Sequence, residues 1–269
     1  MLLRPVPSWS RPAVLWLGVA GCWQPTGQLD YMVSSPPSAP ASVAGILSAH
    51  FSRDAQRDRA PADAIVLVFD RELDATSLVG RAFMVVLSDG SRVRAASAVF
   101  APASEDDENR TVTLWGDFGE PAGRIPTDVV IIERIWDERG GPLLGASAKI
   151  SAYEDGPRLV AMRGAQAGGG ACGGSAQIIR TYWSDDVLDV GDDDLALIEV
   201  ELADGRSVHP TGFDDTLGNG TDTSDDNVLE LCMSETVEAR SVRIVAGSFA
   251  GPAGWRTGPI RGAVSPASP

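Results

Sequence analysis

The sequence predicts an all-β protein made of two tandem β-sandwich domains. The first supporting observation is that short runs of β-branched and apolar residues recur with turn residues between them, and no long helical period appears. In the first half these runs are Ala64–Phe69, Phe83–Leu87, Arg92–Phe100, Thr111–Trp115, Asp128–Ile135 and Leu143–Ile150. About seven short strands in roughly 110 residues are typical of a sandwich.

A tight hairpin supports the strand assignment. Asp89 and Gly90 lie between the second and third of these runs. Asp-Gly supplies the positive φ angles that a two-residue β-turn needs. We therefore expect Phe83–Leu87 to pair with the strand that begins at Arg92.

An internal repeat is the second observation. Ile198–Val208 aligns with Phe83–Val93 and shares valine, leucine, the Asp-Gly turn and a later valine at the same offsets. Three further pairs keep the same order along the chain: Ile65–Arg71 with Ile178–Asp185, Thr113–Leu114 with Leu229–Leu231, and Val130–Pro142 with Val242–Pro252. We predict two copies of one domain, residues 43–153 and 158–258. The alternative is that two unrelated sandwiches share the same hairpin pattern.

The first copy resembles a bacterial Ig-like domain of the kind found in tandem in S-layer and other surface proteins. Its opening residues match the family pattern at Pro61, Ile65–Phe69, Asp70, Leu73, Asp74 and Ser77, and its closing residues at Trp136–Gly140. The second copy departs from the pattern, because Trp183 replaces Phe69 and the closing acid is missing. The resemblance implies Ig-like folds that act as spacers or binding modules without catalysis of their own.

The first residues predict export. Arg4 and Arg11 precede an apolar run that ends in small residues and Cys22, and this run is too short to span a bilayer. Val19–Cys22 resembles the lipobox of bacterial lipoproteins. That resemblance implies a signal peptide over residues 1–21 and lipidation of Cys22, so that the partner of this end is a membrane. Trp23 after the cysteine implies the outer membrane. The alternatives are an ordinary secretory signal and an N-terminal apolar helix that is kept.

Two stretches of low complexity flank the predicted domains. Residues 22–42 contain the lipidated cysteine and a segment rich in Pro, Ser, Ala and Gly, which reads as a disordered tether. Residues 259–269 have a similar composition and are predicted to be a disordered tail.

The charge balance excludes one class of partner. The chain has 37 acidic and 22 basic side chains, for a net charge of -15. A strongly acidic protein repels nucleic acid, so we expect no nucleic-acid partner.

Cys172 and Cys232 remain once Cys22 is acylated, and an exported pair is expected to form a disulfide. The alternative is a redox or metal-binding pair. That alternative lacks Cys-x-x-Cys spacing, and both histidines, His50 and His209, are distant in the sequence.

No catalytic motif is present. The chain has no Gly-x-Ser-x-Gly, His-Glu-x-x-His or phosphate-binding glycine loop. We expect Gly164–Gly174 to be a loop that brackets the disulfide. His50 and His209 are expected to be ordinary polar residues at strand ends.

Acidic residues gather in two segments of the second half. Asp185, Asp186, Asp189 and Asp192–Asp194 are expected between two strands, and the second segment runs from Asp214 to Asn227. Calcium takes six to eight oxygen ligands, and crowded carboxylates repel one another without a cation. The candidate calcium ligands are Asp192, Asp193, Asp194, Asp214, Asp215, Asp222, Asp225 and Asp226. The alternative is a pair of solvated turns, because neither segment fits the EF-hand spacing.

These observations together predict a lipid-anchored envelope protein that acts as a non-catalytic structural or ligand-binding module. We expect no required cofactor, with calcium as a candidate ligand, and an envelope protein or glycan as a candidate partner beside the membrane. The alternatives are a hydrolase or carbohydrate-active enzyme with a dispersed site, and a subunit of an envelope complex. A triad-like pocket or a pair of acids in a deep cleft would favour the enzyme.

Overall fold

A computed structural model describes the chain over residues 45–53, 63–103, 109–119, 123–152, 156–165, 172–188, 190–214, 226–251 and 254–266. The predicted signal peptide, Cys22 and the tether lie outside the described residues. The predicted all-β, sandwich-type fold is confirmed. No helix in the described part of the chain is long and apolar enough to cross a membrane.

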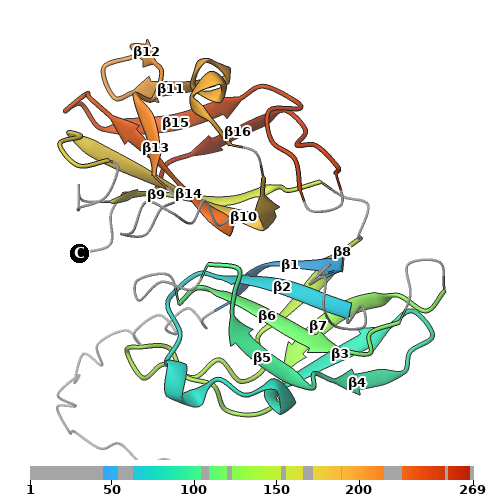
Figure 1. The fold of residues 1–269 in the computed structure, drawn as a ribbon. Coiled ribbons are helices and arrows are strands. Elements are labelled where there is room, and N and C mark those ends of the chain that lie inside the picture. The colour runs from blue at the N-terminus through green and yellow to red at the C-terminus, as the bar shows by residue number, and fades with distance from the viewer. Residues whose placement is uncertain are drawn as a thin grey trace, which may run out of the picture. The chain divides into compact units, whose positions relative to one another are not determined.

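The strands β1–β8 form the first repeat, residues 46–151, and appear as one body in Figure 1. Their hydrogen-bonded order is β4-β3-β7-β8-β1-β2-β6-β5. The sheet encloses an apolar core that includes Phe69, Phe83 and Phe118. The strands are β1 (Ile46–Arg53), β2 (Asp63–Phe69), β3 (Phe83–Leu87), β4 (Arg92–Arg94), β5 (Ser97–Phe100), β6 (Thr111–Gly116), β7 (Pro126–Ile131) and β8 (Ser147–Ser151).

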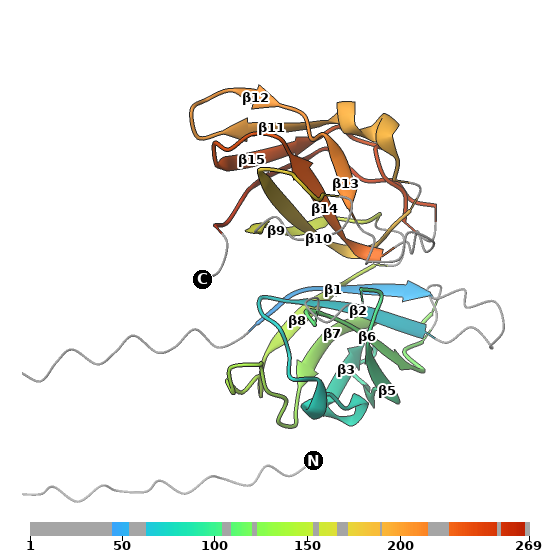
Figure 2. The same cartoon turned by 60° about the vertical axis from the view of Figure 1, so that its left-hand side comes forward.

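The strands β9–β16 form the second repeat, residues 159–263, seen from another side in Figure 2. They make two four-stranded sheets, β13-β14-β10-β9 and β12-β11-β15-β16. Trp183 and Phe249 meet edge to face in the core between them, with ring centroids 5.4 Å apart. The strands are β9 (Leu159–Ala165), β10 (Gln177–Val187), β11 (Ile198–Leu202), β12 (Ser207–Val208), β13 (Gly212–Asp214), β14 (Asp226–Met233), β15 (Ala239–Ile244) and β16 (Ile260–Ala263).

The two repeats have the same topology. If the two sheets of the second repeat are joined through the parallel bridge between Arg163 and Ser265, their order becomes β12-β11-β15-β16-β9-β10-β14-β13. This order matches the first repeat strand for strand. The parallel contact of β1 with β8 corresponds to the contact of β9 with Ser265. The four aligned segment pairs of the sequence therefore occupy equivalent strands.

Short 3-10 helices precede the equivalent hairpins of the two repeats. η2 (Gly80–Ala82) leads into β3, and η3 (Asp192–Leu197) leads into β11. A further one, η1 (Ala75–Ser77), begins where the Asp74 carboxylate accepts a hydrogen bond from the Thr76 backbone N–H. The Asp-Gly turns lie where they were predicted, with Gly90 at φ 81° and Gly205 at φ 86°.

Several strand boundaries differ from the sequence prediction. The run Arg92–Phe100 is divided into β4 and β5, because the backbone N–H groups of Ala95 and Ala96 bond to Phe83 and Trp115 on two different strands. The run from Asp128 ends at Ile131, and β8 begins only at Ser147. β1 was absent from the predicted runs.

The predicted disordered tail is wrong for residues 260–263. They form β16, which pairs with β15 from Ser241 to Ile244. β16 is the counterpart of β8, the last strand of the first repeat. Its Pro- and Gly-rich surroundings resemble a tail in composition, but the repeat needs this strand to complete its sheet.

Candidate functional site

The candidate calcium ligands of the first acidic segment lie on and beside η3. Asp192 and Asp193 are exposed, and the Asp194 carboxylate accepts a hydrogen bond of 3.1 Å from the Gly191 backbone N–H. Asp194 thus has a local role as a helix cap. Asp185 and Asp186 lie within β10, so the expectation that they fall between strands is wrong.

The second acidic segment is described only at its edges. Asp215, Asp222 and Asp225 lie outside the described residues, and Asp226 begins β14, with its side chain also outside them. Asp214 ends β13 and is buried. Its Oδ2 accepts a hydrogen bond of 3.0 Å from the Cys172 backbone N–H. This acid therefore fixes the chain beside the cysteine.

Within the described part of the chain, one group of three potential ligands comes together: Cys172, Asp214 and Glu230. Its donor set is already occupied by other bonds. The Cys172 sulfur is bonded to Cys232, and Glu230 Oε1 pairs with Arg180 at 2.8 and 2.6 Å. Calcium binding by the acidic segments stays a prediction.

Cys172 and Cys232 lie at disulfide distance, with Cα atoms 5.1 Å apart and a sequence separation of 60 residues. Both are buried and pack with Ile178 of β10. The bond ties the segment before β10 to β14.

One Ser–His–Asp arrangement comes together across the two repeats, in the region that we call the junction. His50 of β1 is 1 % exposed, and its Nδ1 lies 2.8 Å from Ser151 Oγ of β8. Its Nε2 lies 3.4 Å from Oδ2 of Asp185 in β10. The prediction that His50 ends a strand is wrong, because it lies inside β1. His209 follows β12 as predicted, with Nδ1 2.7 Å from the Ile198 carbonyl.

The arrangement differs from a working nucleophile. The Ser151 hydroxyl is also within 3.2 Å of the Ala49 carbonyl, to which it can donate its only proton. The imidazole is buried, and neither of the two cavities described below is lined by these three residues. A catalytic serine needs a base beside it and open space for the reacting carbonyl. The contact therefore serves to join β1 and β8 to β10.

Other contacts extend the junction. Val68 and Ala103 of the first repeat pack with Tyr182 and Val228 of the second. Burial raises the pKa of the Tyr182 hydroxyl. Asn227 is fully buried, and its Nδ2 donates to Thr111 Oγ1 at 3.0 Å and to the Trp183 carbonyl at 2.9 Å.

Two arginines from different repeats meet at one carbonyl oxygen in the junction. Arg110 and Arg163 both donate to the Asp70 carbonyl, at 2.8 and 2.7 Å. Burial lowers the pKa of the Arg163 guanidinium, and the charge of Arg110 lowers it further. Arg110 also donates to Glu72 and stacks over the Tyr182 ring.

A small polar cavity of about 280 Å³ opens beside these arginines. It is lined by four acids and four arginines, whose formal charges cancel: Asp70, Arg71, Glu72, Arg110, Asp137, Glu138, Arg139 and Arg163. The hydrogen bond that Glu138 shares with Glu72 raises the pKa of Glu138. Arg71 pairs with Asp70 and Asp137, and Arg110 pairs with Glu72, so this cavity is part of a structural ion-pair network.

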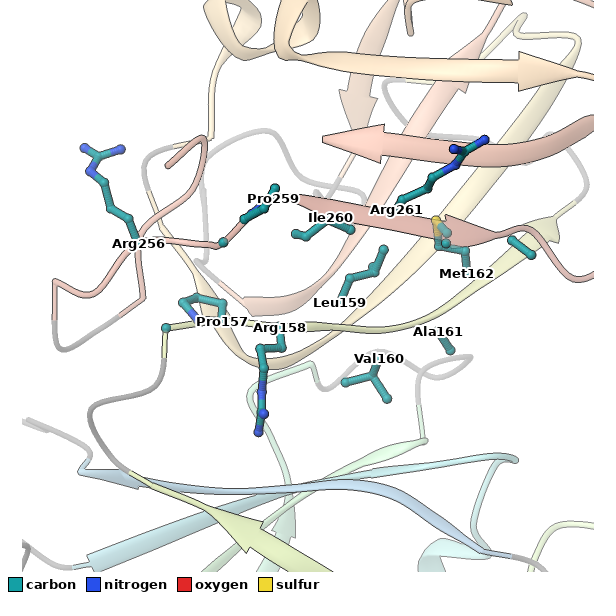
Figure 3. Close-up of a pocket in the computed structure, with 14 residues that line it drawn as sticks. Pro157, Arg158, Leu159, Val160, Ala161, Met162, Arg256, Pro259, Ile260 and Arg261 are labelled. Carbon is teal, nitrogen blue, oxygen red and sulfur yellow. The ribbon is translucent and has the colours of Figure 1, made fainter. Parts of the chain in front are cut away.

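A larger cavity, about 630 Å³, lies in the second repeat between β9 and β16, and we call it the groove. Figure 3 shows Leu159 and Ile260 between the two strands. The groove is lined by Gly156–Met162, Arg256 and Gly258–Ala263, which include three arginines and no acidic residue.

The ends of the groove are closed by backbone contacts. At one end Gly156 lies so close to Arg256 that a Cβ on it would be 2.6 Å from the Arg256 carbonyl oxygen. At the other end Ser265 bonds to Met162 and Gly164. Between these ends the Met162 methyl group covers Gly262, where a Cβ would lie 2.5 Å from it. The groove is therefore a bounded slot along two strand edges.

Sequence reasoning missed both the junction and the groove. One signal for the junction was available, because Ile65–Phe69 is apolar at every position and does not alternate. A strand with both faces buried reads in this way. The groove had no comparable signal, since it depends on β16, which was predicted to be disordered.

Comparisons with known proteins give little beyond this geometry. No protein-family model and no curated protein sequence matches the chain. Among solved structures, the S-layer protein rSbsC(31-844) aligns at 13% identity and a TM-score of 0.30, over 84% of this chain and 26% of that one. The N-terminal part of the bacterial S-layer protein SbsC aligns at 13% and 0.27, over 81% and 44%.

A bovine butyrophilin aligns at 8% identity and a TM-score of 0.17, over 81% of this chain and 99% of that one. Of the two S-layer structures, the chain spans 26% of the length of the longer one. Alignments with such low TM-scores carry no argument about activity or partners.

Proposed function

We propose that the protein is a non-catalytic module of the bacterial cell envelope, anchored by lipid at Cys22 in the outer membrane. The lipobox-like residues Val19–Cys22 and the Pro- and Ser-rich segment after them support the anchor. Two or three acyl chains on one residue hold a protein on a membrane, where a single chain binds only reversibly.

The proposal that the protein is non-catalytic rests on the structural role of the Ser151–His50–Asp185 contact. These are the residue types that a hydrolase would need, yet His50 is 1 % exposed and the contact lies between the repeats. The group joins the two repeats, and its imidazole is buried in that contact.

The rival hydrolase is tested with a fluorophosphonate probe on the purified protein, with a known serine hydrolase as the positive control. We expect no labelling of the wild type above a denatured sample. Labelling that disappears in Ser151→Ala but persists in Ser147→Ala, a control on the same strand, would overturn the proposal.

The anchor is tested by metabolic labelling with an alkyne fatty acid in a bacterial host that processes lipoproteins. We expect label on the wild type and none on Cys22→Ala, and the variant should keep its signal segment. Cys22→Ala protein that still carries label would show that the anchor is elsewhere. Separation of the two membranes by density then reports the location.

A further inference from the structure

We propose that the groove between β9 and β16 receives an extended acidic peptide, which adds as a strand to the free edge of β16. This inference rests on the proposed function, because it names the partner class of a binding module. The evidence is the exposed strand edge, the sign of the charges and their arrangement.

Both walls of the groove are edge strands. Within the described residues, β9 is the last strand of one sheet and β16 is the last strand of the other. Edge strands present unpaired N–H and C=O groups, which an added strand can pair with. In the described part of the chain, the Arg163–Ser265 bridge is the one backbone pairing between these two edges, and the groove lies on the Leu159 side of that bridge.

The hydrogen-bond register shows which backbone groups of β16 face the groove. Val264 N–H donates to the Arg240 carbonyl on β15, and Ser265 bonds to β9 on the opposite side. In an antiparallel pair the bonded residues alternate, so Gly262 and Ile260 also face β15. The N–H and C=O groups of Arg261 and Ala263 therefore face away from β15 and toward the groove.

The charges around the groove favour an acidic ligand. Its lining has three arginines and no acid, although the chain as a whole has a net charge of -15. Arg261 lies directly across from Arg243 in the β15–β16 register. Glu199 pairs with Arg243 at 2.7 Å, whereas the pair of Arg261 with Glu201 is longer, at 3.6 Å. A carboxylate from a ligand would give Arg261 a second partner.

The arrangement of the arginines favours an extended ligand over a compact anion. Figure 3 shows Arg256 and Arg261 toward opposite ends of the groove, while Arg158 points from β9 away from β16. A single phosphate or carboxylate could contact only one of the first two. An extended chain with acids along its length could reach Arg256 and Arg261 while its backbone pairs with β16.

The test uses fluorescence anisotropy with the full mature protein in detergent and a labelled peptide of alternating glutamate and valine. Two control peptides have the same length: one with lysine in place of glutamate, and one with alternate N-methylated residues, which cannot pair as a strand. We expect saturable binding of the first peptide that weakens as salt is added, and no binding of either control.

Variants separate the groove from the rest of the surface. Arg256→Glu/Arg261→Glu should weaken binding by about tenfold or more, because two attractions become repulsions. Arg240→Glu, an exposed site on β15 outside the groove, should leave binding unchanged. Ala263→Pro removes one groove-facing N–H and keeps the bonds to β15, and edge strands tolerate proline where the N–H is free. It should also weaken binding.

Binding that survives both groove variants would overturn the proposal, as would equal binding of the N-methylated peptide. An anionic polysaccharide that competes for the groove and is insensitive to Ala263→Pro would show that the ligand is a glycan. Circular dichroism melting of each variant checks that a loss of binding is not unfolding. None of these outcomes depends on fatty-acid labelling or on the hydrolase probe, so they are independent of the proposed function.

Discussion

The two repeats share one strand order but differ in what holds their equivalent parts together. In the first repeat Asp128 on β7 lies across from Lys149 on β8, and the two form an ion pair. At the corresponding β15–β16 pair Arg243 faces Arg261. These two arginines pair with Glu199 and Glu201 of β11. The first repeat also holds the connection between β7 and β8 with a buried acid, Asp137, whereas the second has a disulfide elsewhere, between the segment before β10 and β14. Equivalent strands of the two repeats are thus held by different kinds of contact.

The disulfide offers the largest test of this difference. Replacing both Cys172 and Cys232 with serine should destabilise the second repeat by about 4 kcal/mol on the chain-entropy model, because the bond closes a loop of 60 residues. Hydrogen exchange followed peptide by peptide should show faster exchange in β10 and β14.

The strands β2 and β6 of the first repeat serve as the internal control, since they are the topological counterparts of β10 and β14 and have no cysteine. If they gained exchange as much as β10 and β14, the two repeats would unfold as a single unit, and the bond would not be specific to the second.

Asp137 provides the reverse test in the first repeat. It is 4 % exposed, and its Oδ1 accepts hydrogen bonds from the backbone N–H groups of Gly141 at 2.6 Å and Arg139 at 3.0 Å. Hydrogen bonds to charged groups contribute about 1.5–3 kcal/mol each, so Asp137→Ala should cost on the order of 3 kcal/mol in the free energy of unfolding.

Urea denaturation followed by exchange in β7 and β8 measures this cost. Glu133→Ala is the matched control, since its carboxylate lies at the surface with two exposed arginines. A change below about 0.5 kcal/mol for Asp137→Ala would mean that the turn does not need its acid.

The Asp128–Lys149 ion pair is expected to have a smaller effect on stability. The hydrogen bond from Lys149 holds the pKa of Asp128 below its ordinary value. A depressed carboxyl pKa contributes stability above the unfolded pKa, and that stability is lost as the pH falls through the folded pKa. Lys149→Met should therefore raise the pKa of Asp128 in an NMR titration and reduce the acid sensitivity of β7–β8.

Because Lys149 is well exposed, its effect on overall stability should be small. Asp204, whose pKa is lowered by Arg206 in the β11–β12 turn of the other repeat, should not change in the same titration. A parallel shift at Asp204 would point to a general change of the structure.

Much of the fold could be predicted from the sequence, because the relevant signals are local. The Asp-Gly turns and the apolar runs Phe83–Leu87 and Ile198–Leu202 specify their hairpins through neighbouring residues alone. β16 could not be predicted in this way, since its four residues contain a glycine and follow a proline. Its pairing with β15 is decided by tertiary contacts.

The candidate sites were harder to predict, because they depend on contacts between distant segments. Asp214 reads as one more acid in an acidic loop, whereas in the fold it is buried beside the disulfide. His50 and Asp185 are 135 positions apart in the sequence, and only the packing of the two repeats brings them to 3.4 Å. The continuous apolar run of β2 did indicate a covered outer face, but not which residues cover it.

The central claim is that the two repeats are joined through a specific buried junction, and a double-mutant cycle tests it most directly. Asn227 and Thr111 belong to different repeats, and their side chains are 3.0 Å apart. Unfolding free energies of the wild type, Asn227→Ala, Thr111→Val and the double variant give the coupling between them. We predict a coupling of about 0.5–1.5 kcal/mol, the usual net contribution of one hydrogen bond. A coupling of zero within error would contradict a junction through these residues.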